Sequence, residues 1–380
     1  MNNRLFEPSA INSMVLKNRF VRSATWEGMA EEDGTCTPGL IDLMATLAKG
    51  GVGLIITGHT YVRRDGQASS KQLGVYKDEL IPGLEEMTRA VHKKDGKIVM
   101  QLAHAGFHAI EELTGQPVIT PSVGETRSKL SQKEMNIQDI NEICQAFAKG
   151  AARAKKTGFD GVQIHSAHGY LLSQFLSPSY NRRKDAYGGN IENRARALLE
   201  VFKAIRMEVG PDYPIMVKLN VQDFVENGLI LEDSIQVGSL LAMEGIDAIE
   251  LSGGLLTAFK QGPSRVGIKT EEKEAYFRNE AHAFKEKIQV PLILVGGIRS
   301  YHVARGLVDE GVADYISMSR PFIREPSLIN RWQTGEIMRA ACISDNRCFK
   351  PARDGEGICC VNEGIKYTGK DQKICGISSS

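Results

Sequence analysis

The 380-residue chain lacks the long apolar runs, the charge excess and the signal sequence that mark several classes of protein. No stretch reaches the roughly 18 apolar residues that a membrane span needs. The 47 Lys and Arg residues nearly balance the 46 Asp and Glu residues, for a net charge of +1. We therefore expect neither a membrane nor a nucleic acid as a partner. The N-terminus, Met1 to Pro8, has neither a basic start nor an apolar region, so a cytoplasmic location is expected.

Cysteine is scarce through most of the chain. Cys36 and Cys144 are isolated, and the remaining cysteines gather near the C-terminus at Cys342, Cys348, Cys359, Cys360 and Cys375. An odd total of 7 without a secretion signal argues against a disulfide framework. Hydrophobic residues make up 42% of the chain and charged residues 24%, which is the composition of a globular protein and excludes a disordered one.

Short apolar segments recur along the chain and predict strands. They are rich in Val, Ile and Leu without polar alternation, as strands buried on both faces of a parallel sheet are. The expected strands are Arg19–Ala24, Gly53–Thr57, Ile98–Leu102, Gly161–Ile164, Pro214–Leu219, Asp247–Leu251, Pro291–Val295 and Asp314–Met318.

Helical patterns lie between these segments. Apolar stripes run from Leu40 to Ala48, from Ile140 to Ala154 and from Ile191 to Phe202, with glycines ending each pattern at Gly50–Gly51, Gly158 and Gly210. Eight strand–helix units predict an α/β fold, a single (β/α)₈ TIM barrel over residues 1–335. A doubly wound sheet is the alternative, because strand order cannot be derived from this pattern. Residues 336–380 lose the strand–helix rhythm and are expected to form a C-terminal extension.

Polar residues and long loops follow the expected strands. The segments Phe107–Met135, Ser166–Gly189 and Leu255–Lys273 are longer than a bare barrel needs. In a barrel, the loops after strands build the active face. The strand ends carry Gln101, His165, Lys218, the pair Gly296–Gly297 and the pair Ser319–Arg320.

The last two units indicate a phosphate site. Gly296 and Gly297 allow close approach to the backbone, the helix starting near Ser300 would offer free amides, and Arg320 can form a fork on a phosphate. A tight turn with a structural arginine is the competing interpretation.

The pair His165 and His168 allows three interpretations. A metal pair lacks a nearby carboxylate ligand, and buried structural histidines are a second possibility. The third is a pair of donors aimed at a substrate carbonyl, with Tyr170, whose intrinsic pKa is about 10, as a neutral acid.

Several motifs together resemble the Old Yellow Enzyme family of FMN-dependent NADH:flavin oxidoreductases, especially the branch near bacterial 2,4-dienoyl-CoA reductase. The resemblance covers roughly residues 5–335 and depends on ordered blocks. The matching blocks are LKNRF at 16–20, QLAHAG at 101–106, HSAHGY at 165–170, FLSP at 175–178, YGG at 187–189, ENR at 192–194 and SRP at 319–321.

The resemblance implies a set of site residues. Ser23, Ala24, Thr25 and Trp26 would lie along one edge of the flavin; Gly58, His59 and Gln101 would lie beside its pyrimidine ring; and Gly296, Gly297, Ser319 and Arg320 would cradle its phosphate. His165 and His168 would hold the carbonyl oxygen of the substrate, and Tyr170 would supply a proton. The implied activity is an ene-reductase that takes hydride from NAD(P)H and reduces the activated C=C bond of an α,β-unsaturated carbonyl compound.

The sequence departs from the family pattern at three positions. Lys218 replaces an arginine that usually faces the flavin, and so keeps the charge but loses the planar fork. Trp26 takes a position where relatives have a smaller group, with plain packing as the alternative, and Gly28 lacks an aromatic side chain found in some relatives.

The tail resembles an iron–sulfur motif in which one ligand has changed. Cys342, Asp345, Cys348 and Cys359 follow the spacing only in part, and thiolate is the ligand that iron–sulfur clusters prefer. We expect no metal here and reduced thiols in a degenerate motif.

Two other functions stay open at this point. One is a Schiff-base lyase that uses Lys218 on the same barrel, and the other is a non-catalytic flavin-binding protein. The alkene substrate, the choice of NADH or NADPH and a homo-oligomeric state are left undetermined by these residues.

Overall fold

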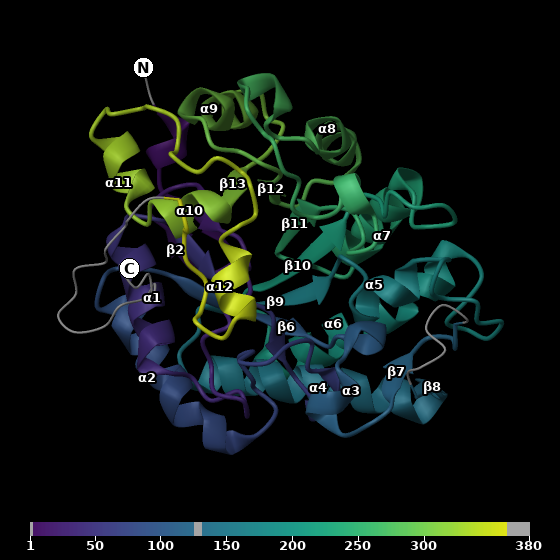
Figure 1. Ribbon diagram of the computed structural model, residues 1–380. Helices are drawn as coiled ribbons and strands as arrows, with labels where there is room; N and C mark the ends of the chain where they lie inside the picture. The colour runs from purple at the N-terminus through teal and green to yellow at the C-terminus, as the bar shows by residue number, and fades with distance from the viewer. Residues whose placement is uncertain (1–2, 125–130, 363–380) are drawn as a thin grey trace.

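Eight parallel strands close into a barrel in the computed structural model, which describes residues 3–124 and 131–362 (Figure 1). The barrel strands are β3 (Phe20–Arg22), β4 (Leu54–Ile56), β6 (Ile98–Ala103), β9 (Gly161–Ser166), β10 (Ile215–Asn220), β11 (Ala248–Ser252), β12 (Leu292–Val295) and β13 (Tyr315–Met318). Each pairs with the next along the chain, and β13 pairs with β3. This ring confirms the predicted (β/α)₈ barrel and excludes the doubly wound sheet.

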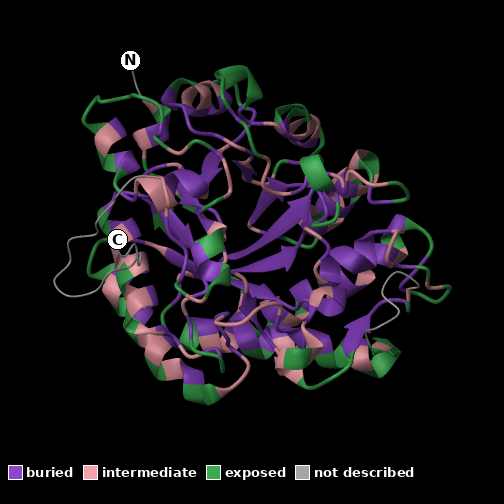
Figure 2. Cartoon of the chain, viewed as in Figure 1, coloured by how far each residue is buried: buried purple, intermediate pink, exposed green. Residues whose placement is uncertain are grey.

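Helices cover the outside of the barrel. Each connection between successive barrel strands contains one of α1 (Pro38–Lys49), α2 (Ile81–His92), α4 (Ile137–Lys156), α6 (Ile191–Val209), α7 (Leu231–Met243), α8 (Arg278–Lys287) and α9 (Tyr301–Asp309). Figure 2 shows buried strands inside and helices with one exposed face outside. None of the helices in the described ranges has both the length and the apolar character that a membrane crossing requires.

Local sequence explains where these helices begin. Thr37 accepts a hydrogen bond from the Leu40 amide and Pro38 opens α1. Asn136 and Asp139 form a reciprocal capping box at the start of α4. The three predicted apolar stripes lie within α1, α4 and α6.

A hairpin that the sequence analysis did not predict covers the amino-terminal end of the barrel. Strands β1 (Ser9–Ile11) and β2 (Met14–Leu16) are antiparallel and joined at Asn12, whose φ is 51°. Their buried side chains pack against residues inside the barrel, namely Val21, Leu54, Ile56, Val99, Met216, Ala248, Ile293 and Tyr315. This end is therefore sealed, and the opposite end is left for a ligand.

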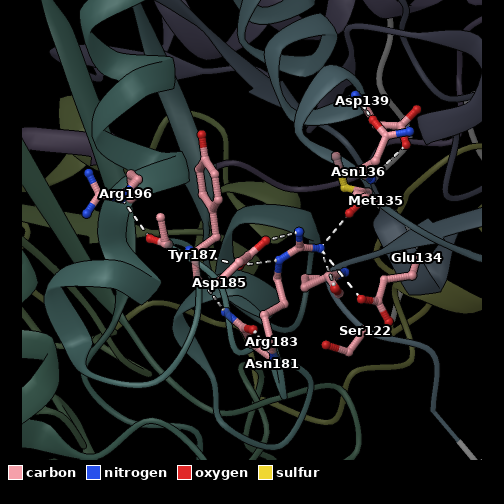
Figure 3. Close-up of polar contacts among 12 residues, drawn as sticks. Ser122, Glu134, Met135, Asn136, Asp139, Asn181, Arg183, Asp185, Tyr187 and Arg196 are labelled. Atoms are coloured by element: carbon pink, nitrogen blue, oxygen red, sulfur yellow. Dashed lines mark hydrogen bonds and ion pairs between the residues drawn. The ribbon is translucent and has the colours of Figure 1, made fainter.

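The long loops after β6 and β9 are joined through Arg183 (Figure 3). Its guanidinium donates to the carbonyl oxygens of Met135 (2.5 Å) and Pro121 (3.0 Å), and it forms a two-pronged pair with Asp185 (3.0 and 2.5 Å). The first loop contains α3 (Glu111–Thr114), β7 (Val118–Thr120) and β8 (Gln132–Glu134), and the second contains α5 (Leu171–Leu176). The two loops therefore form one connected rim.

The C-terminal part of the described chain returns to the open end of the barrel. After β13 come α10 (Arg320–Arg324) and α11 (Leu328–Gln333), and an extended stretch leads to α12 (Phe349–Arg353). Figure 1 shows this stretch and α12 in yellow, crossing in front of the barrel strands. Its side chains at Ser344, Asn346, Phe349 and Arg353 line the main cavity.

Candidate active site

A cavity of about 460 Å³ opens at the carboxyl ends of the barrel strands. Nearly all of the predicted site residues line it: Ser23, Ala24, Thr25, Trp26, His59, Gln101, His165, His168, Tyr170, Lys218, Gly297, Ser319 and Arg320. Gly58 and Gly296 do not line it and instead precede residues that do. A volume of this size is typical of a site for a cofactor or small molecule.

Gly58 is placed by a buried carboxylate behind the cavity. Its amide donates to Glu27 Oε1 (3.0 Å), and Glu27 pairs with Arg22 (2.8 Å). A Cβ at position 58 would lie 2.2 Å from Glu27 Oε2. Only glycine fits here, and the hydrogen bond to Glu27 fixes the turn that presents His59.

One wall of the cavity is a histidine cluster, consisting of His59, His165, His168 and Tyr170. The rings of His165 and Tyr170 are 4.6 Å apart, and those of His165 and His168 are 5.4 Å apart. His168 Nε2 lies 2.7 Å from the Ser252 hydroxyl, and His59 Nε2 lies 3.3 Å from the Tyr170 hydroxyl. His165 Nδ1 is buried without a hydrogen-bond partner in the described part of the protein.

Burial keeps this cluster uncharged. Desolvation lowers the pKa of His59 to about 4 and lowers the pKa values of His165 and His168 well below 6.5, with neighbouring positive charge adding to the shift for the last two. Desolvation also raises the pKa of Tyr170. At neutral pH the cluster therefore presents neutral imidazole N–H groups and a protonated phenol, which are hydrogen-bond donors without charge.

The wall beside it is a Glu250 network, consisting of Ser23, Gln163, Lys218, Glu250 and Ser317. Ser23, Lys218 and Ser317 line the cavity, and Lys218 is the cross-strand neighbour of His165. Glu250 accepts hydrogen bonds from Ser23 (2.7 Å), Ser317 (2.8 Å) and Gln163 (2.8 Å), and its Oε2 lies 3.2 Å from the Lys218 ammonium. Lys218 also donates to Ser23 Oγ (2.8 Å). Burial alone would raise the pKa of Glu250, but the Lys218 charge and the hydrogen bonds outweigh it and lower the pKa. The carboxylate therefore stays ionised, and Lys218 is its partner.

Gln101 extends this network toward the flavin edge that the sequence implied. Its Nε2 donates to Gln163 Oε1 (2.7 Å), and its backbone amide donates to Thr57 (3.1 Å). Trp26 Nε1 is buried and has no partner in the described ranges. Polar groups without partners in a cavity wall are where a ligand gains hydrogen bonds.

The third side of the cavity has unused donors suited to an anion. Gly297 has φ +73°, and a Cβ there would lie 2.8 Å from the Tyr276 ring. The amides of Gly297, Ser319 and Arg320 donate to no other described residue. Among the residues that the structure describes, Arg320 donates only through Nη1, toward Arg265 O (2.9 Å) and Asn346 Oδ1 (2.8 Å). Its other guanidinium nitrogens remain for a phosphate.

The amides just before the helix that starts near Ser300 are bound by a carboxylate. The amides of Arg299 and Ser300 donate to Glu274 Oε2 (2.7 and 2.8 Å), and the Ser300 hydroxyl donates to Oε1 (2.7 Å). A carboxylate from the loop after β11 therefore occupies the two amides that precede α9 (Tyr301–Asp309), whereas the amides of Tyr301, His302 and Val303 donate to no other described residue. Gly297, Ser319 and Arg320 line the cavity on this side.

The tail cysteines are arranged differently from the expected motif, and the expectation of reduced thiols is wrong for Cys359, which is disulfide-bonded. Cys342, Asp345, Cys348 and Cys360 line one small cavity, whereas Cys359 lines another beside α1. Asp345 accepts a hydrogen bond from Asn362 (2.7 Å). In the described ranges no group of three or more His, Cys, Asp or Glu side chains is placed to hold a metal ion. Cys375 lies outside the described residues.

Sequence reasoning missed several residues that shape the site. Glu250, Gln163 and Glu27 are buried behind the cavity, and Ser252 and Asn346 contact His168 and Arg320. An acidic residue within the apolar run Asp247–Leu251 was a usable signal, because a buried carboxylate needs partners. Asn346 gave no comparable signal, since it lies in a segment without periodicity.

Comparison with known proteins identifies the family. A model described as the NADH:flavin oxidoreductase / NADH oxidase family matches residues 4–337. The chain belongs to this family of FMN-dependent oxidoreductases, the Old Yellow Enzyme family that the motifs indicated. The comparisons do not specifically show the 2,4-dienoyl-CoA reductase branch, which stays a prediction.

Individual relatives agree with this family. The NADH oxidase of Thermoanaerobacter brockii is 35% identical over 350 residues, covering 90% of this chain and 52% of that protein. A 2-naphthoyl-CoA reductase in complex with 2-naphthoyl-CoA has a TM-score of 0.84 at 28% identity, covering 93% of this chain and 55% of that one. An old yellow enzyme homologue from Zymomonas mobilis has a TM-score of 0.76 at 26% identity, covering 90% and 95%. This chain spans about half the length of the first curated relatives it matches.

The residues present fit FMN. The unused donors at Gly297, Ser319 and Arg320 suit its phosphate, and the unpartnered groups along the cavity wall suit a polar ring system. Family membership and this donor set agree, and FMN is the cofactor that the site accommodates.

Proposed function

We propose that this protein is an ene-reductase, which takes hydride from NAD(P)H and reduces the activated C=C bond of an α,β-unsaturated carbonyl compound. The observation that carries the proposal is the histidine cluster, where neutral donors and a protonated phenol meet at one wall of the cavity. FMN, when bound, supplies the transfer of hydride from the nicotinamide to the alkene. The protein supplies binding, orientation and a proton.

His165 and His168 would hold the carbonyl oxygen. Negative charge develops on this oxygen as hydride reaches the β-carbon, and fixed donors in a buried site stabilise such charge strongly. Ser252 can donate to Nε2 of His168, which leaves the proton of the neutral ring on Nδ1. Tyr170 would then deliver a proton to the α-carbon.

Other residues would hold the cofactor. The stretch Ser23–Trp26, Gly58, His59 and Gln101 would lie at the flavin ring, Lys218 would supply positive charge near it, and Gly296, Gly297, Ser319 and Arg320 would hold the phosphate. Burial lowers the pKa of Lys218, which by itself would suit a Schiff-base lysine. The lyase is disfavoured because Lys218 Nζ is held by Glu250 Oε2 (3.2 Å) and Ser23 Oγ (2.8 Å) and because the chain belongs to a flavin oxidoreductase family.

Stopped-flow measurement of both half-reactions tests the function. We expect NAD(P)H to bleach the flavin and an enone such as cyclohex-2-enone to restore its colour under anaerobic conditions. In Tyr170→Phe the second step should slow by about 10²–10⁴-fold, the usual contribution of a general acid, while bleaching remains. Bleaching without any reoxidation by enones would favour a non-catalytic flavin protein. Equal slowing of both steps would mean that Tyr170 shapes the pocket and the proton has another source.

A further inference from the structure

His59 is held rigidly with its ring against the proposed proton donor. Its carbonyl oxygen accepts a hydrogen bond from Gln72 (2.9 Å), and the turn before it is fixed through Gly58 and Glu27. The rings of His59 and Tyr170 meet edge to face at 5.2 Å, with Nε2 lying 3.3 Å from the Tyr170 hydroxyl. Backbone hydrogen bonds on both sides of His59 therefore hold its ring next to Tyr170.

No other described side chain forms a hydrogen bond with the Tyr170 hydroxyl. The neighbouring histidines have different contacts, since His168 Nε2 lies next to Ser252 and His108 Nε2 lies 3.3 Å from Tyr180. His165 stacks near the Tyr170 ring but makes no hydrogen bond with its oxygen. His59 alone joins Tyr170 by a polar contact within these ranges.

The other ring nitrogen of His59 faces the cavity. Nδ1 makes no hydrogen bond in the described part of the chain, yet it is not among the buried atoms that lack a partner. His59 also lines the cavity and is only partly buried. Water in the cavity can therefore reach Nδ1 while Nε2 remains on Tyr170.

A neutral His59 fits a specific hydrogen-bond direction. With its proton on Nε2, the ring donates to the phenol oxygen and leaves the phenol proton directed at another acceptor. A tyrosine that gives up a proton inside a buried site would be left as an uncompensated anion, which is costly unless a proton returns.

We infer that His59 is a proton relay that restores Tyr170 during alkene reduction, an inference that rests on the proposed function. As hydride forms the bond to the β-carbon, the Tyr170 O–H bond breaks and a C–H bond forms at the α-carbon. The His59 Nε2–H bond breaks as the Tyr170 O–H bond re-forms, and Nδ1 takes a proton from cavity water. The proton supply ends at bulk solvent, and no oxidant or reductant beyond the proposed reaction is needed.

The decisive comparison uses two variants of His59. In His59→Gln the amide nitrogen can keep the contact with Tyr170 but cannot pass a proton through the ring, whereas His59→Ala leaves space for added imidazole. We expect reoxidation of the dithionite-reduced enzyme by cyclohex-2-enone to slow by about 10²-fold in both, within the range of acid–base catalysis. Added imidazole should restore His59→Ala, and His59→Gln should add no slowing to Tyr170→Phe.

A matched control is His108→Gln, which changes a histidine whose ring is 6.3 Å from Tyr170 but whose polar contact is with Tyr180. Its reoxidation rate should stay within about twofold of the unmodified protein. Reoxidation of His59→Gln at the unmodified rate, or no response of His59→Ala to imidazole, would overturn the relay.

The unmodified protein gives a second readout if the variants lose flavin. If two protons move in the same step, a plot of the reoxidation rate against the D₂O fraction should fall below the straight line that joins its two end points. A straight line means that a single proton moves and refutes the relay. If the unmodified protein reacts with enone and the relay tests fail, only the inference fails. If the unmodified protein does not react, the proposed function fails with it.

Discussion

The two walls of the cavity avoid the cost of buried charge in opposite ways. The histidine cluster is partly buried at His59, His168 and Tyr170, whereas the Glu250 network is buried throughout. The histidine cluster stays neutral because desolvation lowers the pKa values of its imidazoles. In the Glu250 network the carboxylate stays charged, paired with the Lys218 ammonium and accepting hydrogen bonds from three further side chains. The neutral wall, which is the histidine cluster, has polar atoms without partners among the described residues, such as His165 Nδ1. In the charged wall, which is the Glu250 network, the charged groups are paired with each other and hydrogen-bonded to other side chains. The first wall is therefore the one with donors free for a ligand, and the second wall fixes Lys218 and Ser23 at the edge of the cavity.

Removing the carboxylate should break the charged wall most severely. Glu250→Ala leaves the Lys218 ammonium buried and unpaired, which costs about 3–5 kcal/mol of unfolding free energy. Urea denaturation followed by circular dichroism measures the loss. The double variant Lys218→Met/Glu250→Leu removes both charges and should recover most of it.

An exposed ion pair provides the control for this prediction. Glu244 lies 2.8 Å from Lys203 with 37% and 53% of the side chains exposed. Glu244→Gln should cost less than about 1 kcal/mol. Equal losses in the two variants would mean that the Glu250 network is not a buried, coupled unit.

Arg320 belongs to neither wall, and part of its guanidinium makes no hydrogen bond with the described residues. Arg320→Ala should weaken FMN binding by about 1.5–3 kcal/mol, or tenfold or more in dissociation constant. Fluorescence titration of the flavin-free protein with FMN measures the change. Arg324→Ala, in the same helix but outside the main cavity, is the control, and unchanged FMN affinity in Arg320→Ala would refute the phosphate assignment.

Acidification should weaken the neutral wall before the charged one. The unfolded chain binds protons at its histidines near pH 6.5 while folded His165 and His168 do not, so stability falls as pH drops below about 6.5, at up to about 1.4 kcal/mol per pH unit for each group. Glu250 has a lowered pKa, and its contribution is lost only below about 4.5. Urea midpoints at pH 7, 6 and 5 measure this order. The slope should be smaller in His165→Gln/His168→Asn, and an identical slope would contradict it.

Asn346 should give the smallest effect, because we expect it to act on FMN through the Arg320 guanidinium that it holds. It accepts hydrogen bonds from Arg320 (2.8 Å) and Ser264 (2.8 Å). Losing one such contact costs about 0.5–1.5 kcal/mol, so Asn346→Ala should raise the FMN dissociation constant a few-fold. In the Arg320→Ala background the same substitution should have no further effect on FMN affinity. A full additional loss there would show that Asn346 acts independently of Arg320.

The sequence predicted the barrel well because its signal is local. Apolar runs such as Ile98–Leu102 matched β6 closely, and polar residues at strand ends met in one cavity, as parallel strands require. What was missed depends on contacts between distant segments. Glu274 reaches the amides just before α9, and Ile11 and Met14 close the far end of the barrel. No periodicity in either segment identifies its partner.

The roles of the site residues depended on resemblance more than on pattern. The blocks around Gln101 and His165 indicated the family, and the comparisons confirmed it. The opposite nature of the two walls could not be predicted, since burial of His165 and pairing of Lys218 are properties of the closed barrel. Cys359 also shows the limit of spacing, because the adjacent Cys360 shares a cavity with Cys342 and Cys348 instead.

The chain after β13 shows that the barrel and the cavity at its open end are completed at different residues. The ring of strands is complete at Met318 and the outer helices at Gln333, but the cavity still takes wall residues from as far along as Arg353. A truncation after residue 335 would therefore preserve the barrel's connectivity and remove a side of its flavin pocket. For anyone designing shorter variants, fusions or chimaeras of this protein, the cavity, and not the ring of strands, sets where the chain can be cut.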